Sequence, residues 1–507
     1  MLMEMAIGPV GARLWRNILS RGNVIAGRGN QIRERGERAL TAIQEEPVNA
    51  ARANGTGPRS AWRQMTASFH HRNYRLFFFG QLVSVIGTWM QTVAQSFLVL
   101  DLTHSGTQLG LTTAARFLPI LIFGQAGGLF ADRRATRRIL LVTQTSAGCL
   151  AAVFAVLTGT HEIRLWSVYL LAIELGFVNV FDNPARQAFI SEMVPPRDLA
   201  NAVTLNSVAM NMARVLGAAV GGLLAAIGLT LCFALNAVSF GAVLLSLALM
   251  STAALYPARP ASKEPGQIRA GLRYVRSTPA LLIPLLMIAV VGTLAWEFQV
   301  SLPLMASHVF GRGAAAYGVM ASVMGVGAVA GGLVSAARAR PSGRALCLAS
   351  IGWGIAILLA AFSPSLPLEL AALLLVGYGS ITFNSMAKTV LQLAATPEMR
   401  GRVMALWGLA WLGSTPIGGP IVGWVGQEAG ARWSLVVGGV PTLLCGLLAL
   451  PALVTIDRRR GDPSRPPAAM SRLLPSFIPN GRVASPGQPI AGRSEETSDA
   501  NTTTELR

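Results

Sequence analysis

The chain has 507 residues, of which 52% are hydrophobic and 13% are charged, and its mean hydropathy is +0.50. The apolar residues form continuous blocks of about 20, the length that a helix needs to cross a hydrocarbon layer, which excludes a soluble globular protein. Continuous blocks favour helices over a β-barrel, whose strands alternate. The net charge is +19, and most of the basic residues lie between and outside the blocks. It therefore indicates orientation in a lipid bilayer and not a nucleic-acid partner.

The blocks divide the chain into two similar halves. Residues 1–72 are basic and are expected to form a disordered cytoplasmic extension; Met65 is an alternative start of translation. We expect residues 73–254 and 280–456 each to form a six-helix half, joined by a polar cytoplasmic linker at 255–279, and we expect 457–507 to form a disordered cytoplasmic tail. The sequence predicts transmembrane helices at about 75–99, 107–130, 139–159, 165–184, 203–227, 230–254, 280–304, 315–337, 345–363, 367–389, 403–426 and 433–456.

Basic residues in the short loops predict the orientation, because loops on the cytoplasmic side carry more arginine and lysine. One side carries little beyond Arg164, Arg312 and Arg432. The opposite side carries Arg133, Arg134, Arg137, Arg138, Arg186, Arg197, Arg259, Lys263, Arg269, Arg273, Arg276, Arg338, Arg340, Arg344, Lys388, Arg400 and Arg402. We therefore expect a multi-pass protein of the bacterial inner membrane, monomeric, with both termini in the cytoplasm.

The chain matches itself when it is shifted by 202 residues. Asp182 then falls on Asn384, and Arg186 falls on Lys388. Gly217 and Gly221 fall on Gly419 and Gly423. Loop residues and glycines agree in one register, which favours gene duplication over chance similarity of apolar helices. Two parallel repeats of six helices enclosing a site near the bilayer midplane are the arrangement of the major facilitator superfamily.

The loop between the second and third predicted helices resembles the signature loop of that superfamily. Gly128 is followed by Asp132, then by the cluster Arg133, Arg134, Arg137 and Arg138. The glycine would let two helices approach, and the aspartate would face the positive end of a neighbouring helix. The resemblance implies contacts that hold one conformation and break in the other. Simple positive-inside topology would explain the arginines, but not the spacing of Gly128 and Asp132.

Further motifs resemble one bacterial branch of the superfamily, which includes the enterobactin exporter and macrolide efflux proteins. These are 182–190, 194–195, 199–202, 214–217, 271–275 and 400–404, including Asp182, Arg186, Arg214, Gly217 and Arg400. The resemblance covers about residues 70–455. It implies secondary-active export of a small organic molecule, normally coupled to protons. The fifth helix lacks the proline that often follows its glycine in drug exporters, whereas the eleventh retains Gly419-Pro420 and Gly423.

Four ionisable residues are expected well inside predicted helices: Arg116, Glu174, Arg214 and Glu297. Unpaired charges are costly in a bilayer, so these side chains should face the interior of the protein. We expect Glu174 to pair with Arg214 or Arg116, either as a structural pair or as part of coupling or gating. Glu297 has no such partner in its own half and is the preferred site of protonation, because burial favours the neutral form of a carboxyl group.

Six aromatic and polar residues in predicted helices are candidates for an apolar substrate cavity, although ordinary helix packing is the alternative for each. They are Trp89, Gln95, Trp296, Tyr317, Tyr378 and Trp407. No phosphate-binding loop, metal-ligand spacing or enzyme motif is present in the sequence, so neither a metal nor a cofactor is expected. The leading hypothesis is a proton-coupled exporter. The alternatives are an importer or facilitator of a lipid or metabolite, and a membrane sensor or partner protein without transport.

Overall fold

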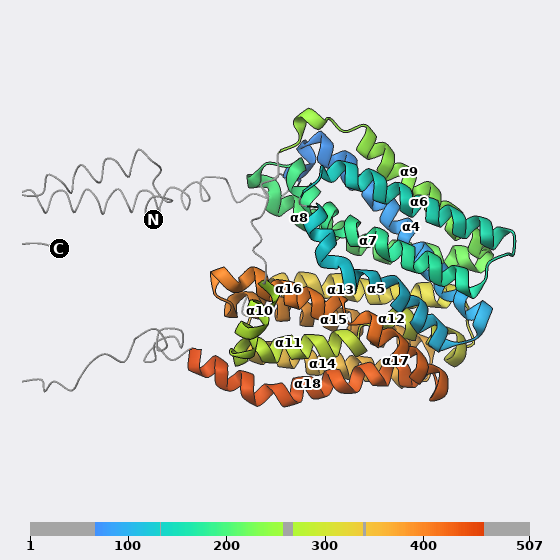
Figure 1. The fold of residues 1–507 in the computed structure, drawn as a ribbon. Helices are drawn as coiled ribbons and strands as arrows, with labels where there is room; N and C mark the ends of the chain where they lie inside the picture. The colour runs from blue at the N-terminus through green and yellow to red at the C-terminus, as the bar shows by residue number, and fades with distance from the viewer. Residues whose placement is uncertain (1–65, 132, 257–266, 338–340, 461–507) are drawn as a thin grey trace, which may run out of the picture. The chain divides into compact units, whose positions relative to one another are not determined.

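The computed structural model describes residues 66–131, 133–256, 267–337 and 341–460 (Figure 1). These residues form helices and short connections, without a strand, which confirms the predicted all-helical class. The first half contains α4 (Arg72–Thr103), α5 (Gly106–Ala131), α6 (Thr136–Gly159), α7 (Leu165–Met193), α8 (Leu199–Ile227) and α9 (Leu229–Ala248). A one-turn helix, η1 (Ala67–His70), precedes them, and the short η2 (Pro196–Asp198) leads into α8.

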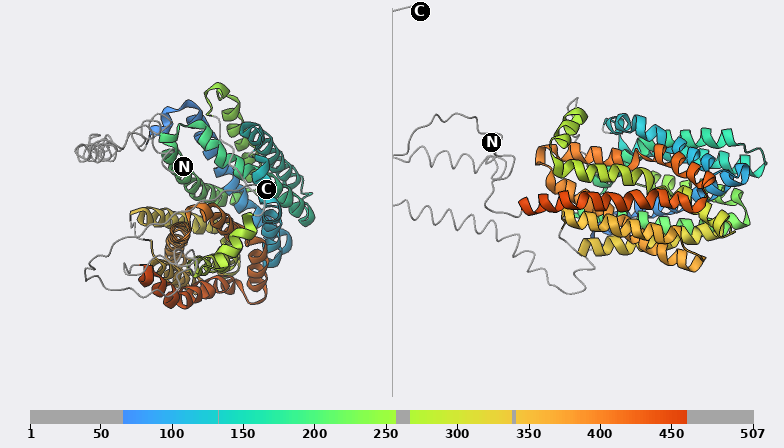
Figure 2. Two further views of the ribbon diagram at one scale, coloured as in Figure 1. Left: turned by 60° about the vertical axis from the view of Figure 1, so that its left-hand side comes forward. Right: turned by 90° about the horizontal axis from the view of Figure 1, so that it is seen from below.

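The second half contains α11 (Pro279–Leu294), α12 (Phe298–Leu304), α13 (Ala314–Ala337), α14 (Gly343–Ala361), α15 (Leu366–Ala394), α16 (Pro397–Leu412), α17 (Thr415–Glu428) and α18 (Ala431–Arg460). Figures 1 and 2 show α4–α9 as one bundle and α11–α17 in a second bundle beside it. Among the described residues, 11 helices are long and apolar enough to cross a membrane. The shorter α16 and α17 follow one another along the chain in place of the helix predicted at 403–426.

Two predicted transmembrane helices are interrupted in the structure. The prediction of one continuous helix at 403–426 is wrong, because α16 ends at Leu412 and α17 begins at Thr415. Pro416 explains the restart, since proline lacks the N–H group that a helix interior requires but fits the first turn. The helix predicted at 280–304 breaks between Leu294 and Phe298 and then continues to Val309 through a wider π turn. A non-helical backbone inside a membrane protein requires protein or a cavity around it.

The two interruptions lie against each other. A Cβ atom built on Gly292 of α11 would lie 3.0 Å from the carbonyl oxygen of Ala410 and 3.1 Å from the hydroxyl of Ser414. The linker between the halves also contains a helix that the sequence analysis did not predict, α10 (Gln267–Arg276). Its Gly271 packs against Arg402 and Leu406 of α16.

Aromatic residues fill the core of the first bundle. Phe77 of α4 meets Phe189 of α7 edge to face, with 5.5 Å between the ring centroids. Phe154 of α6 stacks on Phe233 of α9 at 5.0 Å. All four side chains are buried, and such pairs add to the energy of simple burial.

Candidate transport site between the two bundles

One cavity is lined by residues from both bundles. Trp89 of α4, Arg214 of α8, Trp296 between α11 and α12, and Tyr317 of α13 all contribute to its wall. The sequence analysis named these three aromatic residues as cavity candidates, and the structure brings them together. Tyr378 and Trp407 do not line this cavity. Tyr378 instead packs its backbone against Gly331, and Trp407 lies beside Lys388.

Arg214 lines this cavity, and no acid among the described residues forms an ion pair with it. Its guanidinium carbon lies 5.0 Å from the centroid of the Trp89 ring, the geometry of a cation–π contact. Its Nε atom is buried and has no hydrogen-bond acceptor among the described residues. Trp296 continues the aromatic wall. Its ring centroid lies 4.3 Å from that of Trp411 and 6.1 Å from that of Trp353.

Arg116 lines a second, more polar pocket. Thr92, Gln95, Ser96, Thr112, Thr113 and Gln299 also line it. The only hydrogen bond of Arg116 in the described structure is a long one of 3.4 Å, from Nη1 to the hydroxyl of Thr92. Gln299 of α12 lines this pocket and the Arg214 cavity alike, so the two spaces adjoin. The predicted cavity residue Gln95 therefore belongs to the Arg116 pocket.

Glu297 lies in the break between α11 and α12, with only 3% of its surface exposed. One carboxyl oxygen, Oε1, is buried without a hydrogen-bond partner in the described structure. A Cβ atom built on Gly418 would lie 3.2 Å from Oε1, and one built on Gly419 would lie 3.7 Å from Oε2. Glu297 therefore sits directly behind the glycine face of α17.

The expected pairing of Glu174 with an arginine is wrong. Glu174 is exposed on α7, and the ion pairs of the described residues join His71 to Asp198, Arg186 to Asp182 and Arg197 to Asp198. The sequence analysis also missed a buried acid, Glu369 in the first turn of α15. It is fully buried, and neither carboxyl oxygen has a hydrogen-bond partner in the described structure. Glu369 was overlooked because it lies near the end of a predicted helix. An acid within an apolar block could nevertheless have indicated a buried charge.

Glycines let the two bundles approach at one end. On one flank, a Cβ atom on Gly419 of α17 would lie 2.9 Å from the carbonyl oxygen of Gly110 in α5, and one on Gly106 would lie 2.8 Å from that of Gly423. Pro420 also contacts Gly110. On the other flank, Gly222 of α8 and Gly318 of α13 meet, with a Cβ on either lying 2.7 Å from the Cα of the other. These close approaches need residues without side chains.

Hydrogen bonds reinforce both flanks. The Ser105 hydroxyl and the Thr107 backbone N–H donate to the side-chain oxygen of Gln427. On the other flank, the Ser322 hydroxyl donates to the carbonyl oxygen of Val215 at 2.9 Å. Gly106 begins α5 and Gln427 is near the end of α17. The junction therefore lies at the membrane side whose loops carry few arginines.

The repeat-related glycines of the first half have a different role. Gly217 packs on Ile86 and Trp89 of α4, and Gly221 packs on Met90 of the same helix. These contacts lie within the first bundle, whereas Gly419 and Gly423 join the two bundles. The two halves therefore use corresponding glycines for different interfaces.

The signature loop is described only in part. Asp132 lies outside the described residues, so its predicted role stays a prediction. Gly128 does not make the expected close approach, because a Cβ atom built there would meet nothing within 4 Å; its neighbour Gly127 instead packs on the backbone of Val180. Arg133 and Arg138 are exposed. Arg137 donates from Nε to the carbonyl oxygen of Leu247 at 2.9 Å, and so caps the end of α9.

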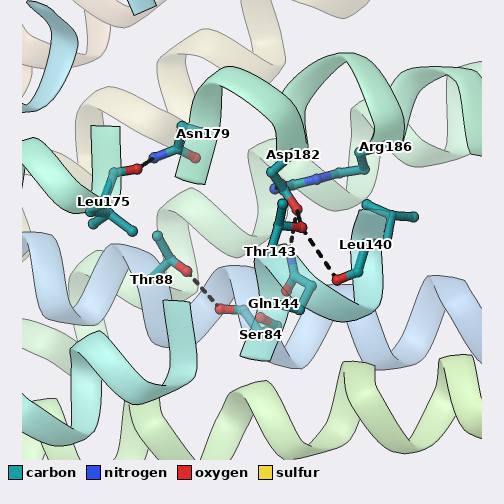
Figure 3. A network of polar contacts seen from close by, with 9 residues as sticks. All are labelled: Ser84, Thr88, Leu140, Thr143, Gln144, Leu175, Asn179, Asp182 and Arg186. Atoms are coloured by element: carbon teal, nitrogen blue, oxygen red, sulfur yellow. Dashed lines mark hydrogen bonds and ion pairs between the residues drawn. The ribbon is translucent and has the colours of Figure 1, made fainter. Parts of the chain in front are cut away.

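Asp182 anchors a polar network inside the first bundle (Figure 3). Its side chain is 2% exposed and accepts hydrogen bonds from Thr143 at 2.8 Å and Gln144 at 2.7 Å. It also forms an ion pair with Arg186. The second half differs, because the Asn384 side-chain oxygen has no hydrogen-bond partner among the described residues and Lys388 lies over the Trp407 ring, 5.3 Å from its centroid. Arg400 donates to the carbonyl oxygen of Gln392 near the end of α15.

Comparison with known proteins agrees with this architecture. A family model described as transmembrane secretion effector, of major facilitator type, matches residues 63–468. The chain belongs to this family of major facilitator superfamily transporters. It is similar to the enterobactin exporter EntS of Shigella boydii and of Escherichia coli, at 27% identity over 415 residues in each case. Each alignment covers 79% of this chain and 96% of the relative. These relatives are membrane transporters and not enzymes, and they place the chain among multi-pass membrane proteins.

Solved transporters share the fold. A bacterial homologue of the human lysosomal transporter Spinster, inward-facing and unoccupied, matches with a TM-score of 0.61 and 17% identity, covering 81% of this chain and all of that one. A POT family transporter in complex with 5-aminolevulinic acid matches with a TM-score of 0.62 and 13% identity, covering 76% and 96%. At these identities the likeness concerns the fold alone.

Proposed function

We propose that this protein exports a small organic molecule by alternating access, driven by the proton gradient across the bacterial inner membrane. The observation that carries the proposal is the position of Glu297, a buried carboxyl group directly behind the glycines through which the two bundles meet. A group there is able to link its own charge to the opening of the junction. The protein works as a monomer, with both termini in the cytoplasm.

The state described here is closed at the arginine-poor end. The glycine contacts of α5 with α17 and of α8 with α13 form this closure. With the arginine-rich loops in the cytoplasm, the closed end faces outward, and the cavity would load from the cytoplasm. Opening then requires Gly110 to separate from Gly419 and Gly222 to separate from Gly318.

The surroundings of Glu297 support proton coupling. An ionised carboxylate is costly to bury without a counter-charge, so the neutral acid suits the closed junction. When α17 moves away from α5, water reaches the carboxyl group and lowers the free-energy cost of its ionised form. The proton would be taken up from the outer side before the junction closes and released towards the cytoplasm while the junction is closed, so that one proton moves inward in each export cycle.

Export is favoured over import by the named relatives. The enterobactin exporters are exporters, and the matching family is described as secretion effectors. The alternatives of an importer or of a sensor without transport have no observation of this kind in their favour.

The test is reconstitution of the purified protein into vesicles with an imposed pH gradient and an enclosed pH-sensitive dye. A panel of small aromatic solutes is offered, and both solute accumulation and proton flux are measured. We expect wild-type protein to accumulate at least one solute uphill with matching proton flux. Glu297→Gln, which mimics the neutral acid, should abolish uphill accumulation and keep downhill exchange.

Glu428→Gln is the matched control, because Glu428 is an exposed acid at the end of α17. It should transport as wild type does. Uphill accumulation that survives in Glu297→Gln would overturn the coupling role of Glu297. Solute exchange without any proton flux in wild type would overturn proton coupling itself.

A further inference from the structure

Two arginines face the space between the bundles, and no acid of the described part of the chain balances their charge. Arg116 lines the polar pocket and Arg214 lines the cavity that adjoins it at Gln299. None of the residues that line either space is an aspartate or glutamate. No described acid lies within ion-pair distance of Arg116 or Arg214, since the ion pairs in the described structure involve other residues.

Other arginines of this protein have plain structural roles. Arg137 caps α9, Arg400 donates near the end of α15, and Arg432 donates to the carbonyl oxygens of Ala361 and Ser363 near the end of α14. Arg116 and Arg214 do not cap helix ends, because each lies near the middle of its own helix. Arg116 has one long hydrogen bond, to Thr92, and Arg214 has its contact with the Trp89 ring.

A cation held inside a membrane protein without a counter-charge is expensive, and such residues mark ligand or ion pathways. At a rise of 1.5 Å per residue, Arg116 lies about 15 Å from the start of α5 at Gly106, which is about half of a 30 Å hydrocarbon layer. This depth is where superfamily sites lie. The missing counter-charge is therefore supplied by what enters the space.

The cavity wall specifies the rest of the ligand. Trp89, Trp296 and Tyr317 present ring surfaces beside Arg214, which suit a flat apolar body. We infer that the transported substrate is an organic anion with a planar, aromatic body, whose carboxylate, phenolate or similar acidic group binds Arg116 and Arg214. This inference rests on the proposed transport function and names its substrate class. A cationic substrate would meet like charge and no acid in the same space.

The test is equilibrium binding of a matched set of probes to the full-length protein in lipid nanodiscs. The probes are radiolabelled 2-naphthoate, its neutral amide and 2-naphthylmethylamine, which share a ring system and differ in charge. We expect 2-naphthoate to bind at least about tenfold more tightly than either of the others, as a charge-assisted hydrogen bond provides. Arg116→Gln and Arg214→Gln should each weaken 2-naphthoate about 10-fold to 100-fold and leave the amide unchanged.

Arg214→Lys keeps the charge but not the planar fork, so it should retain part of the 2-naphthoate affinity. Arg312→Gln is the matched control, because Arg312 is exposed outside the helices, and it should bind as wild type. Equal or tighter binding of the amide or the amine, or full 2-naphthoate affinity in an Arg116→Gln, Arg214→Gln double variant, would overturn the anion assignment. Absence of charge-dependent binding by any probe would overturn it too.

Transport separates the two proposals. The same variants are reconstituted with an imposed pH gradient. Uphill transport of the amide or amine in place of 2-naphthoate would keep the export function and overturn the anionic class. Arginine-dependent binding of 2-naphthoate without uphill transport would keep the anion site and overturn coupled export.

Discussion

Gly110 of α5 and Gly419 of α17 face each other where the two bundles meet, and a Cβ atom on Gly419 would lie 2.9 Å from the carbonyl oxygen of Gly110. The atoms in the way are backbone, so neither helix can yield by turning a side chain. Behind Gly419 lies Glu297, 3.7 Å from the same Cβ position. Gly419 therefore links the close packing of α5 and α17 to the charge of Glu297.

Gly110→Val should hold the junction open. Overpacking of a tight contact costs about 1–3 kcal/mol, which shifts a two-state equilibrium by about 5-fold to 150-fold. With cysteines at Ser105 and Gln427, whose side chains are hydrogen bonded in the closed state, a short cross-linker should react correspondingly more slowly. Transport should fall as well.

Gly241→Ala is the control, because a Cβ atom at Gly241 would meet nothing within 4 Å. Cross-linking and transport should both stay at the wild-type level. Unchanged cross-linking in Gly110→Val would show that α5 and α17 do not form the closure.

Asp182→Ala should destabilise the protein. It removes the acceptor of two hydrogen bonds and leaves Arg186 without its acid inside the first bundle. Breaking a buried pair in this way costs about 3–5 kcal/mol. The expected result is a lower temperature of unfolding in detergent and a lower yield from the membrane.

Glu174→Gln is the comparison for Asp182→Ala, because Glu174 is exposed on the same helix. Its unfolding temperature should match that of wild type. A loss of stability in Glu174→Gln similar to that of Asp182→Ala would mean that Glu174 has the structural partner that the sequence suggested.

The architecture was readable from the sequence, because it depends on the length and order of apolar blocks. Repeat-related glycines and the Asp182-to-Arg186 motif were also readable as a pattern. Their contacts were not, since Gly217 packs within one bundle and Gly419 joins two. Which face of a helix a residue occupies decides such contacts, and α7 turns Glu174 outward while Asp182 is buried.

The sequence predicted which types of residue form the candidate site better than it predicted which residues contact one another there. Trp89, Trp296 and Tyr317 line one cavity, and their role in binding a substrate stays a prediction. The predicted pairing of Glu174 with an arginine was wrong, because opposite charges in one bundle do not have to be in contact. The break before Glu297 was also not predicted, because the apolar run continues through it.

Orientation is tested by labelling from outside intact cells, in a variant without the four native cysteines. A cysteine in place of Thr160, exposed after α6, should react with a membrane-impermeant maleimide. One in place of Ser277, exposed in the linker, should react only after the cells are opened, because arginine-rich loops stay in the cytoplasm. Labelling of position 277 in intact cells would reverse the orientation.

Glu369 provides the sharpest comparison for the coupling role of Glu297. Both acids are buried, at 0% and 3% exposure, and both have carboxyl oxygens without hydrogen-bond partners in the described structure. Their surroundings differ. Glu369 lies in the first turn of α15 and lines neither the cavity nor the Arg116 pocket, whereas Glu297 lies behind the glycines of α17.

Glu369→Gln should therefore retain proton-driven uphill transport in reconstituted vesicles, under the conditions in which Glu297→Gln loses it. Glutamine has nearly the shape of the acid, so packing is preserved in both variants and only the ability to exchange a proton is removed. The measurement is the solute accumulation ratio and the proton flux at one imposed pH gradient. Equal loss in the two variants would mean that both buried acids are needed, and the coupling role would not belong to Glu297 alone. Loss confined to Glu369→Gln would move the coupling site away from the junction between the bundles.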